Sequence, residues 1–386
     1  MGDQEAIGTA GGLPSSARRI LRLVLVLGAL YLFLAAISSL ETGIGMLGEN
    51  LVDQVFSAVA NPLTGLAAGL LATVLVQSSS ATTSIIVGLV GAGVLTVEAA
   101  VPMVMGANIG SAVTSTLASL GHIRQGVYFE RGFAAATMQD FYNILAVVIF
   151  LPLELAFGAI SKAARGLAGL VTAWGSDSGP SEGGGGLSLG DIVDAPVDAL
   201  ANLLNGWGLG TAAGPVMIAL GLAALVVALI LVTRLMKQLV STRMELAVNS
   251  ILSKRGGFMA VLAGLFMTLA VQSSGITNSI MVPLVAAGVL SMPNAFPVIL
   301  GADLGTTATA VLASVAASSP EALVIAMAHV VINFAGIFVF YPMKVRQVPI
   351  RMAQWLSKTA VANKTWVAVY IITVFVAAPV LILILS

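Results

Sequence analysis

Long apolar runs separated by short polar stretches dominate the pattern of the 386-residue chain. An α-helix needs about 20 apolar residues to cross a bilayer. The runs lack the period of two that marks barrel strands, so they predict membrane-spanning helices. The predicted full spans are residues 20–40, 131–153, 215–233, 322–341 and 366–385. Two further predicted spans, residues 98–119 and 295–318, are broken by glycines and polar side chains.

Two other apolar stretches carry a polar motif at their centre. The motifs are Gln77-Ser78-Ser79 and Gln272-Ser273-Ser274, and the apolar run after each has only about 15 residues, which is too short to cross. Each stretch therefore predicts a re-entrant helical hairpin, at residues 57–95 and 256–293. The tip of such a hairpin lies inside the membrane, where protein or water must satisfy its backbone.

The hairpins belong to an internal repeat. Residues Val76–Ser119 recur without a gap at Val271–Ser314, an offset of 195 residues with 23 identities in 44 positions. Within the repeat, Gly106-Ala107-Asn108-Ile109-Gly110 matches Gly301-Ala302-Asp303-Leu304-Gly305. Two such copies in an apolar chain predict a repeat transporter with its binding site between the halves.

Composition and charge set the environment and the topology. Only 9% of the residues are charged, against about 25% in soluble domains, which indicates an integral membrane protein. If neither hairpin crosses, 15 of the 17 basic residues fall on the side of the N-terminus, so the positive-inside rule places that side in the cytoplasm. Three predicted spans separate the hairpins, so the repeats are inverted. We expect a multi-pass protein of the plasma (inner) membrane.

The predicted fold is an all-α integral membrane protein of two inverted repeats, each with a re-entrant hairpin, together with broken and full transmembrane helices. Its predicted parts are a cytoplasmic tail (1–19), a first half (20–153), an extracytoplasmic Gly-rich acidic linker (154–214) and a second half (215–386). A stretch at 155–173 could form an interfacial helix. The absence of cysteine excludes disulfides and thiolate metal sites, and the zero net charge gives no sign of a nucleic-acid partner.

The hairpin tips carry the candidate chemistry. Each tip precedes a helix whose first N–H groups are unpaired and attract anions, while hydroxyl, amide and carbonyl oxygens suit Na⁺. No Lys or Arg lies at membrane depth in the predicted layout, so bound cations would have to neutralise the anion. This favours cation-coupled symport. The alternative is that the Ser and Thr side chains serve only helix packing.

Two acids and one histidine stand at membrane depth. Asp303 replaces Asn108 of the first copy, and an intramembrane acid is a functional hypothesis by default. We expect Asp303 to help hold a cation on one side only; otherwise it is a buried acid bound to backbone N–H groups. Asp140 could serve the site or could be a structural capping group. His329 could serve the site or could contribute only polar packing. The asparagines that follow them are expected to orient the hairpins: Asn143 and Asn333.

These motifs resemble the type II sodium/phosphate cotransporter family. The resemblance rests on the two Gln-Ser-Ser motifs, the two Gly-Ala-Asn/Asp runs, and the segments at 139–143 and 329–333 that end in Asn, and it covers roughly residues 60–153 and 255–341. Gly275 stands at the fourth position of its motif, where the first copy has Ser80, and Gln139 stands where the family often has His. The short linker without cysteine suggests a bacterial-type member.

The resemblance implies Na⁺-coupled import of inorganic phosphate by alternating access, with Na⁺ as coupling ion, no other cofactor and no enzymatic activity. The residues expected to bind phosphate are Gln77, Ser78, Ser79, Gln272, Ser273 and Ser274. Those expected to bind sodium are Ser80, Thr82, Asn108, Thr277, Asn278 and Asp303. Those expected to support the site are Asp140, Asn143, His329 and Asn333.

Other functions remain open at this stage. Polar tips could form the filter of an ion channel, although two unequal half-sites lack the ring symmetry of a filter. A cation-coupled carrier of another small oxyanion would need the same chemistry. An intramembrane hydrolase would pair a serine with His329, although no Gly-flanked nucleophile motif is present. The expected partners are the lipid bilayer, phosphate and Na⁺, and the oligomeric state, a homodimer included, stays open.

Overall fold

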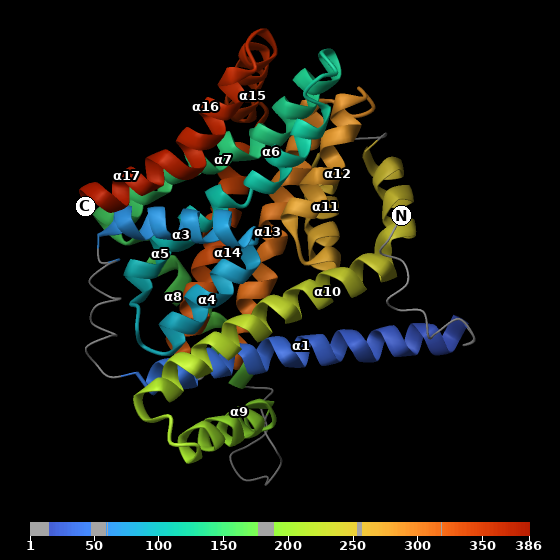
Figure 1. The fold of residues 1–386 in the computed structure, drawn as a ribbon. Coiled ribbons are helices and arrows are strands. Elements are labelled where there is room, and N and C mark those ends of the chain that lie inside the picture. Colours follow the sequence, from blue (N-terminus) through green and yellow to red (C-terminus); the bar gives the residue numbers. More distant parts are fainter. Residues whose placement is uncertain (1–14, 48–58, 60, 177–188, 253–256, 318) are drawn as a thin grey trace.

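The structure is a computed structural model that describes residues 15–47, 59, 61–176, 189–252, 257–317 and 319–386 (Figure 1). All regular secondary structure in these ranges is helical. Within the described residues, seven helical segments are long and apolar enough to cross a membrane, and each overlaps one predicted span: Ile20–Gly45, Val97–His122, Val127–Phe157, Ala213–Leu235, Met292–Ala316, Pro320–Phe340 and Thr365–Leu385. The prediction of an all-α, multi-pass membrane protein is therefore confirmed.

Most of these segments are single helices, and two are composite. The single ones are α1 (Ser15–Gly45), α7 (Val127–Phe157), α10 (Ala213–Leu252), α13 (Met292–Ala316) and α14 (Pro320–Phe340). The composite ones are α5 (Val97–Gly110) with α6 (Val113–Ser119) and η1 (Leu120–His122), and α16 (Thr365–Ile372) with the π-helical η3 (Thr373–Ala377) and α17 (Ala378–Leu385). The remaining connections are η2 (Gly210–Ala212) and α15 (Met343–Ala362).

One of the two predicted breaks is present, and the other prediction was wrong. The first copy is interrupted at Ser111 and Ala112, between α5 and α6, whereas α13 continues through the matching positions. The hydroxyls of Thr306 and Thr307 donate to the carbonyls three residues back, at 2.6 and 2.7 Å. These side chains are thus satisfied within the helix. Ser111, at the break in the first copy, makes the same bond to the Asn108 carbonyl at 2.7 Å, so side-chain polarity alone does not decide whether the helix continues.

Each Gln-Ser-Ser motif joins two short helices. The first lies between α3 (Pro62–Val76) and α4 (Ser79–Gly91), and the second between α11 (Phe258–Val271) and α12 (Ser274–Ala286). These helices have 13 to 15 residues, so each is about 20–22 Å long. A helix of that length falls short of a hydrocarbon core about 30 Å thick.

The two copies pack in the same way. Gly106 of α5 lies so close to the Leu66 carbonyl of α3 that a Cβ atom would overlap it, and Gly301 of α13 meets the Val261 carbonyl of α11 likewise. Glycine permits this close approach of two backbones, a common device in membrane helix packing. Since the offset is again 195 residues, the repeat in the sequence is also a repeat of tertiary contacts.

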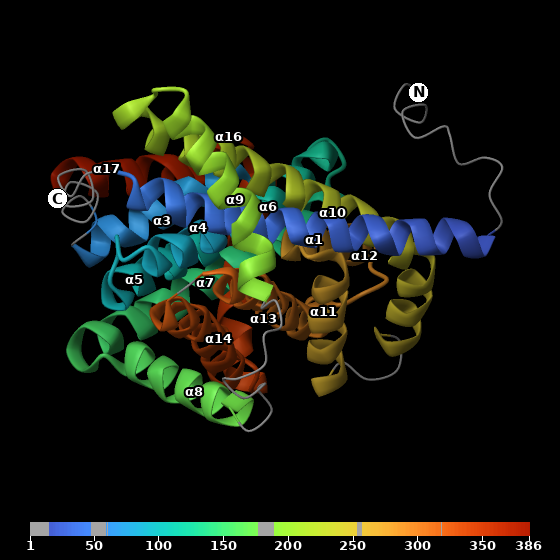
Figure 2. The same cartoon turned by 90° about the horizontal axis from the view of Figure 1, so that it is seen from below.

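Helices α1 and α10 run side by side along one flank of the repeats (Figures 1 and 2). Helix α9 (Leu189–Gly206) packs on α1, where Ser38 donates to Asp194 at 2.6 Å and Tyr31 donates to the Ile192 carbonyl at 3.0 Å. Much of the interval 154–214, predicted as a linker, is therefore helical. Its Gly-rich part, 177–188, lies outside the described residues.

The predicted helix at 155–173 corresponds to α8 (Ala159–Ser176), which packs on α14 (Figure 2). Its start is capped by the Glu154 carboxylate, which accepts the N–H groups of Ile160 and Ser161 at 2.7 and 3.1 Å and also the Ser161 hydroxyl. The buried side of the helix carries Ile160, Ser161, Ala164 and Ala168, at helical spacing.

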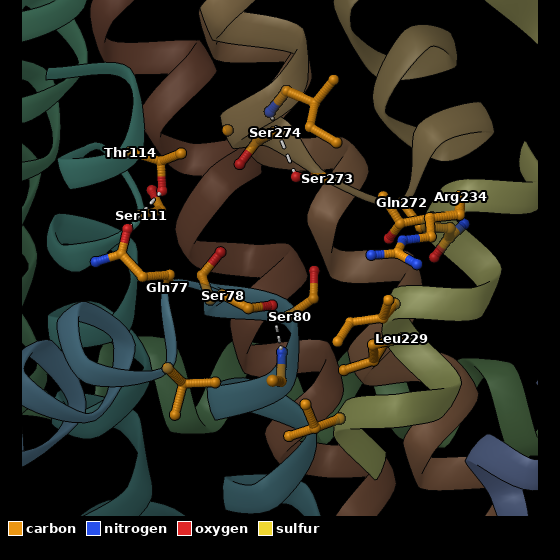
Figure 3. A pocket seen from close by; sticks show the side chains of 18 residues that line it. Gln77, Ser78, Ser80, Ser111, Thr114, Leu229, Arg234, Gln272, Ser273 and Ser274 are labelled. Carbon is orange, nitrogen blue, oxygen red and sulfur yellow. Dashed lines mark hydrogen bonds between the residues drawn. The ribbon is translucent and has the colours of Figure 1, made fainter. Parts of the chain in front are cut away.

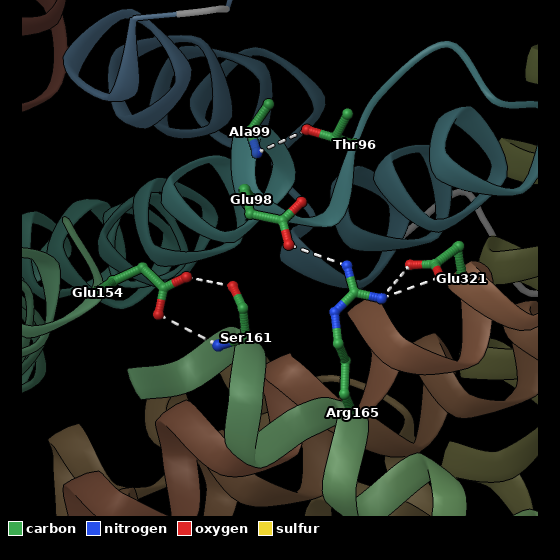
Figure 4. Close-up of polar contacts among 7 residues, drawn as sticks. All are labelled: Thr96, Glu98, Ala99, Glu154, Ser161, Arg165 and Glu321. Atoms are coloured by element: carbon green, nitrogen blue, oxygen red, sulfur yellow. Dashed lines mark hydrogen bonds and ion pairs between the residues drawn. The ribbon is translucent and has the colours of Figure 1, made fainter. Parts of the chain in front are cut away.

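A three-residue ion cluster ties α8 to both halves (Figure 4). Arg165 donates to both carboxylate oxygens of Glu321 and to Glu98, each at 2.9 Å. Glu98 lies in the first turn of α5 and Glu321 in that of α14, where a negative charge suits the helix dipole. The hydrogen bond to Glu98, and to a smaller extent that to Glu321, raises the pKa of the Arg165 guanidinium. Arg165 therefore stays charged.

Candidate functional site

Both tips bend at a glutamine with left-handed backbone. Gln77 has φ 58° and Gln272 has φ 56°, and among the described residues no other non-glycine residue has positive φ. This region is unfavourable for side chains with a Cβ and is often found at functional sites. Each glutamine Nε2 donates to a carbonyl three residues back, that of Val74 at 2.6 Å and that of Leu269 at 2.7 Å. The glutamines therefore close the first helix of each hairpin.

The serine after each glutamine begins the second helix. Ser78 Oγ accepts the Ala81 N–H at 3.2 Å, and Ser273 Oγ accepts the Ile276 N–H at 3.4 Å. The serine hydroxyl hydrogens remain available as donors, as do the earliest N–H groups of α4 and α12. Two helix N-termini with free donors are a suitable receptor for an anion.

The two tips line one cavity of about 340 Å³ (Figure 3). All six residues predicted to bind phosphate contribute to its wall, as does Ser80. Ser111 and Thr114 complete the wall on the first half. The structure thus brings together two motifs that stand 195 residues apart in the sequence, and their role in binding phosphate remains a proposal.

A face of α10 forms the third wall of the cavity. It consists of Val226, Leu229, Ile230, Thr233 and Arg234, whose spacing marks one side of a helix. The spacing of these residues can be read from the sequence. The packing of α10 against the two hairpin tips cannot. Our expectation that no basic side chain reaches the anion site is wrong for Arg234, which directly follows the predicted span 215–233.

A buried polar cluster centred on Gln139 lies behind the cavity. Gln139 Nε2 donates to Asp303 Oδ1 at 2.6 Å and to Ser111 Oγ at 3.1 Å, and its Oε1 accepts from Asn278 Nδ2 at 2.6 Å. Gln139 was noted in the sequence only as a departure from the family pattern. Here it joins two residues predicted to bind sodium, Asp303 and Asn278.

Two oxygens of this Gln139 cluster have no hydrogen-bond partner of good geometry. Asp303 Oδ2 and Asn278 Oδ1 are buried and form no hydrogen bond of good geometry with a described residue, although the Asn143 amide also interacts with the Asp303 carboxylate. Buried polar atoms are nearly always paired, so these two neighbouring oxygens are candidates for binding a ligand. Carboxylate and amide oxygens are what a hard cation prefers. The neighbouring Thr277 donates to the Ser273 carbonyl at 3.3 Å and accepts from Thr268 at 3.0 Å.

The other predicted sodium residues are placed elsewhere. Asn108 Oδ1 contacts His329 Nε2 at 3.1 Å, and Asn108 Nδ2 donates to Asn333 Oδ1 at 3.1 Å. Its carbonyl accepts from Asn143 Nδ2 at 2.8 Å. Since both polar atoms of the Asn108 side chain are used, this cluster of four residues is equipped to hold helices together.

The remaining two, Ser80 and Thr82, lie on α4. Thr82 donates to the Ser78 carbonyl at 3.1 Å. Ser80 accepts from Thr309 at 3.4 Å, and Thr309 also donates to Gln272 Oε1 at 3.2 Å. Thr309 therefore connects the two tips. On the first half, Thr114 makes the matching contact to Gln77 at 3.5 Å.

Asp140 is buried in a separate cluster. Its Oδ2 accepts from Thr116 at 3.1 Å and from Tyr370 at 2.8 Å, and Oδ1 has no partner among the described residues. Tyr370 lies on α16 and drew no attention in the sequence, because nothing there indicates that the last span reaches α7. The structure does not join Asp140 to the Gln139 cluster by hydrogen bonds.

Comparison with known proteins gives a consistent result. The model of the family described as Na⁺/Pi-cotransporter matches residues 32–173 and 224–352. Sodium-dependent phosphate transport protein 2A of Rattus norvegicus is 30% identical over 94% of this chain and 67% of its own length. Sodium-dependent phosphate transport protein 2A of Oryctolagus cuniculus is 31% identical over 96% of this chain and 68% of its own length. Protein 2B of Homo sapiens is 29% identical over 92% of this chain and 63% of its own length. No solved structure matches.

Proposed function

The chain belongs to the Na⁺/Pi-cotransporter family, a family of transporters rather than enzymes, and on this premise we propose that it imports inorganic phosphate together with Na⁺. Phosphate would bind between the two Gln-Ser-Ser tips. Its expected ligands are the side chains of Gln77, Ser78, Ser79, Gln272, Ser273 and Ser274, with the first N–H groups of α4 and α12.

The single observation that carries this proposal is the shared cavity of the tips. A cavity of about 340 Å³ is at the lower end of the range for small-molecule sites, which suits a small anion. Ser78 and Ser273 both present a hydroxyl at a helix start. The positive ends of the two dipoles then face one ligand.

Sodium would bind at Asp303 Oδ2 and Asn278 Oδ1. Asn278 and Thr277 lie on α12, the helix whose start, at Ser273, faces the cavity. A cation at this level would therefore stabilise the anion at the tip through the same helix, and Gln139 would transmit the change to the first half. This arrangement gives a physical reason for coupling, because each ion lowers the cost of binding the other.

Alternating access would use the inverted repeat. The two short-helix hairpins, with matching tertiary contacts at one offset, support two copies of one re-entrant element. The three spans between them, an odd number, support entry from opposite sides. The positive-inside count supports a cytoplasmic N-terminus in the plasma (inner) membrane. Exposing the cavity first outward and then inward requires only that one half moves against the other.

The rival functions receive less support from the geometry. The hydrolase hypothesis needs a tip serine beside His329, but the side-chain partner of His329 is Asn108. A channel would conduct phosphate without energetic coupling, and this difference can be measured. A carrier of another small oxyanion would fit the same cavity and is distinguished by competition.

The test is uptake of labelled phosphate into liposomes that contain the purified protein. A Na⁺ gradient is expected to drive saturable accumulation above the external concentration, and K⁺ or H⁺ gradients of the same size should not. Excess sulfate should compete weakly. Equal uptake in all gradients, or flux that never saturates, would overturn the proposal in favour of a channel.

A further inference from the structure

The α10 wall of the cavity changes character along its length. Val226, Leu229 and Ile230 are apolar, whereas Thr233 and Arg234 at the end of the face are polar and charged. All five lie on one side of the helix, so they contact the same space. A wall that runs from apolar to cationic gives the cavity a positively charged end.

Arg234 is the single charged residue in the lining of this cavity among the described residues. Its side chain is exposed, and it forms no ion pair with a described residue. Figure 3 shows it beside Gln272, at the edge of the space between the tips. The positive charge of Arg234 is therefore free to act on an anion in the cavity.

The common explanation for an arginine at the end of the apolar part of a helix is topology, because basic residues accumulate on the cytoplasmic side and extend toward the lipid headgroups. Such a side chain would face lipid or water. Arg234 instead shares its helix face with Leu229 and Ile230, which line the cavity. Its position on that face needs an explanation beyond membrane insertion.

We propose that Arg234 is a phosphate-contacting residue that attracts the anion to the cavity and discriminates against neutral solutes. The inference rests on the function proposed above and adds a residue to its site. A guanidinium can donate two parallel hydrogen bonds to one phosphate, and a charge at the end of a narrow cavity raises the local anion concentration. Arg234 supplies the full positive charge that the tips lack.

The position also indicates which side this residue serves. Arg234 stands at the end of the apolar segment Ala213–Leu235 of α10, on the side that the proposed orientation makes cytoplasmic. Arg234 would then act in the state that is open to the cytoplasm.

The experiment is equilibrium binding of labelled inorganic phosphate to the purified full-length protein in saturating Na⁺, at low and high ionic strength. A charge-assisted hydrogen bond is worth about a tenfold change in affinity. We expect Arg234→Gln to raise the Kd for phosphate about tenfold or more, and Arg234→Lys to restore part of the loss. High ionic strength should weaken phosphate binding to the wild type more than to Arg234→Gln, which a merely structural role would not produce.

The matched control is Arg351→Gln, because Arg351 is exposed on α15 and does not line the cavity. Its Kd should equal that of the wild type. A Kd for Arg234→Gln within twofold of the wild type would overturn the inference, and so would an equal salt dependence in both. If the wild type itself does not bind phosphate, the proposed function fails first, so the two failures are distinguishable.

Discussion

Gln139 Nε2 donates to Asp303 Oδ1 at 2.6 Å, a contact between residues 164 positions apart that joins the two halves. The contact has a counterpart, in which His329 Nε2 meets Asn108 Oδ1 at 3.1 Å. Asp303 matches Asn108 in the repeat, and Gln139 and His329 each begin one of the two segments that end in Asn, 139–143 and 329–333. Each half therefore extends one side chain across to the central residue of the other, and the two contacts differ chiefly by the charge of Asp303.

Removal of the Gln139 side chain tests this exchange. Gln139→Ala leaves both Asp303 and Asn278 without their present partner, so the cation ligands lose their orientation. We expect the half-saturating Na⁺ concentration for phosphate uptake to rise about tenfold. Gln139→His retains a donor toward Asp303, so its half-saturating Na⁺ concentration should lie between those of the wild type and Gln139→Ala. Gln125→Ala, at an exposed loop position, is the control, and an unchanged Na⁺ curve in Gln139→Ala would argue against the cluster.

Neutralisation of Asp303 tests the proposed cation site. Asp303→Asn keeps the shape and removes the charge, which makes the residue the same as its counterpart Asn108. Uptake should then need more Na⁺, by about tenfold, while the affinity for phosphate at saturating Na⁺ changes little. The assay is the Na⁺ dependence of initial uptake rates. A shift confined to the phosphate curve would contradict the assignment.

The tip serines have two roles that substitutions can separate. Ser78→Ala removes a hydroxyl donor and also a helix cap worth about 1 kcal/mol, whereas glycine at this position costs only a few tenths. Ser78→Gly and Ser273→Gly should therefore raise the half-saturating phosphate concentration about tenfold with little loss of thermal stability. Ser78→Thr retains both roles and should transport. Wild-type uptake in both glycine variants would exclude the tips as the phosphate site.

The close approach of two helices in each repeat predicts that a larger side chain at the contact lowers the stability of the fold. Gly301→Ala places a Cβ against the Val261 carbonyl, so α11 and α13 must separate. We expect a loss of folded protein on gel filtration in detergent. Gly166→Ala, where a Cβ meets nothing within 4 Å, should be neutral or stabilise by about 0.5 kcal/mol. Equal behaviour of the two variants would show that the packing is looser than described.

The Arg165 cluster is expected to contribute to stability alone. Its side chains are 43 to 57% exposed, so each pair contributes at most about 1 kcal/mol. Arg165→Gln should lower the melting temperature slightly, by an amount that shrinks in high salt, and should leave the phosphate and Na⁺ curves unchanged. Transport loss in a well-folded Arg165→Gln protein would give this cluster a functional role.

The sequence predicts the spans and the tips for physical reasons. Apolar length reports directly on bilayer thickness, so all seven long segments overlap their predicted positions. The repeat aligns Gln77 with Gln272, and the structure gives both the same left-handed backbone. Local signals and internal symmetry are enough for these features, because neither depends on which helix packs beside which.

The contacts across the halves could not be obtained in this way. Gln139 meets Asp303, Tyr370 meets Asp140, and Arg234 lines the cavity because of the tertiary arrangement of α7, α13, α16 and α10. The glycines and polar residues of the second copy also predicted a break that α13 does not have, since polar side chains can bond within their own turn. A single sequence therefore locates candidate chemistry on elements, and only packing decides which candidates share a site.

The coupling between the Gln139 cluster and the tips is the central claim, and phosphate binding with and without Na⁺ tests it most directly. Labelled phosphate is bound to the purified protein at equilibrium in Na⁺ and then in the same concentration of K⁺. The account predicts an affinity at least tenfold higher in Na⁺, and a much smaller ratio in Asp303→Asn. Equal affinity for phosphate in Na⁺ and K⁺ would contradict it.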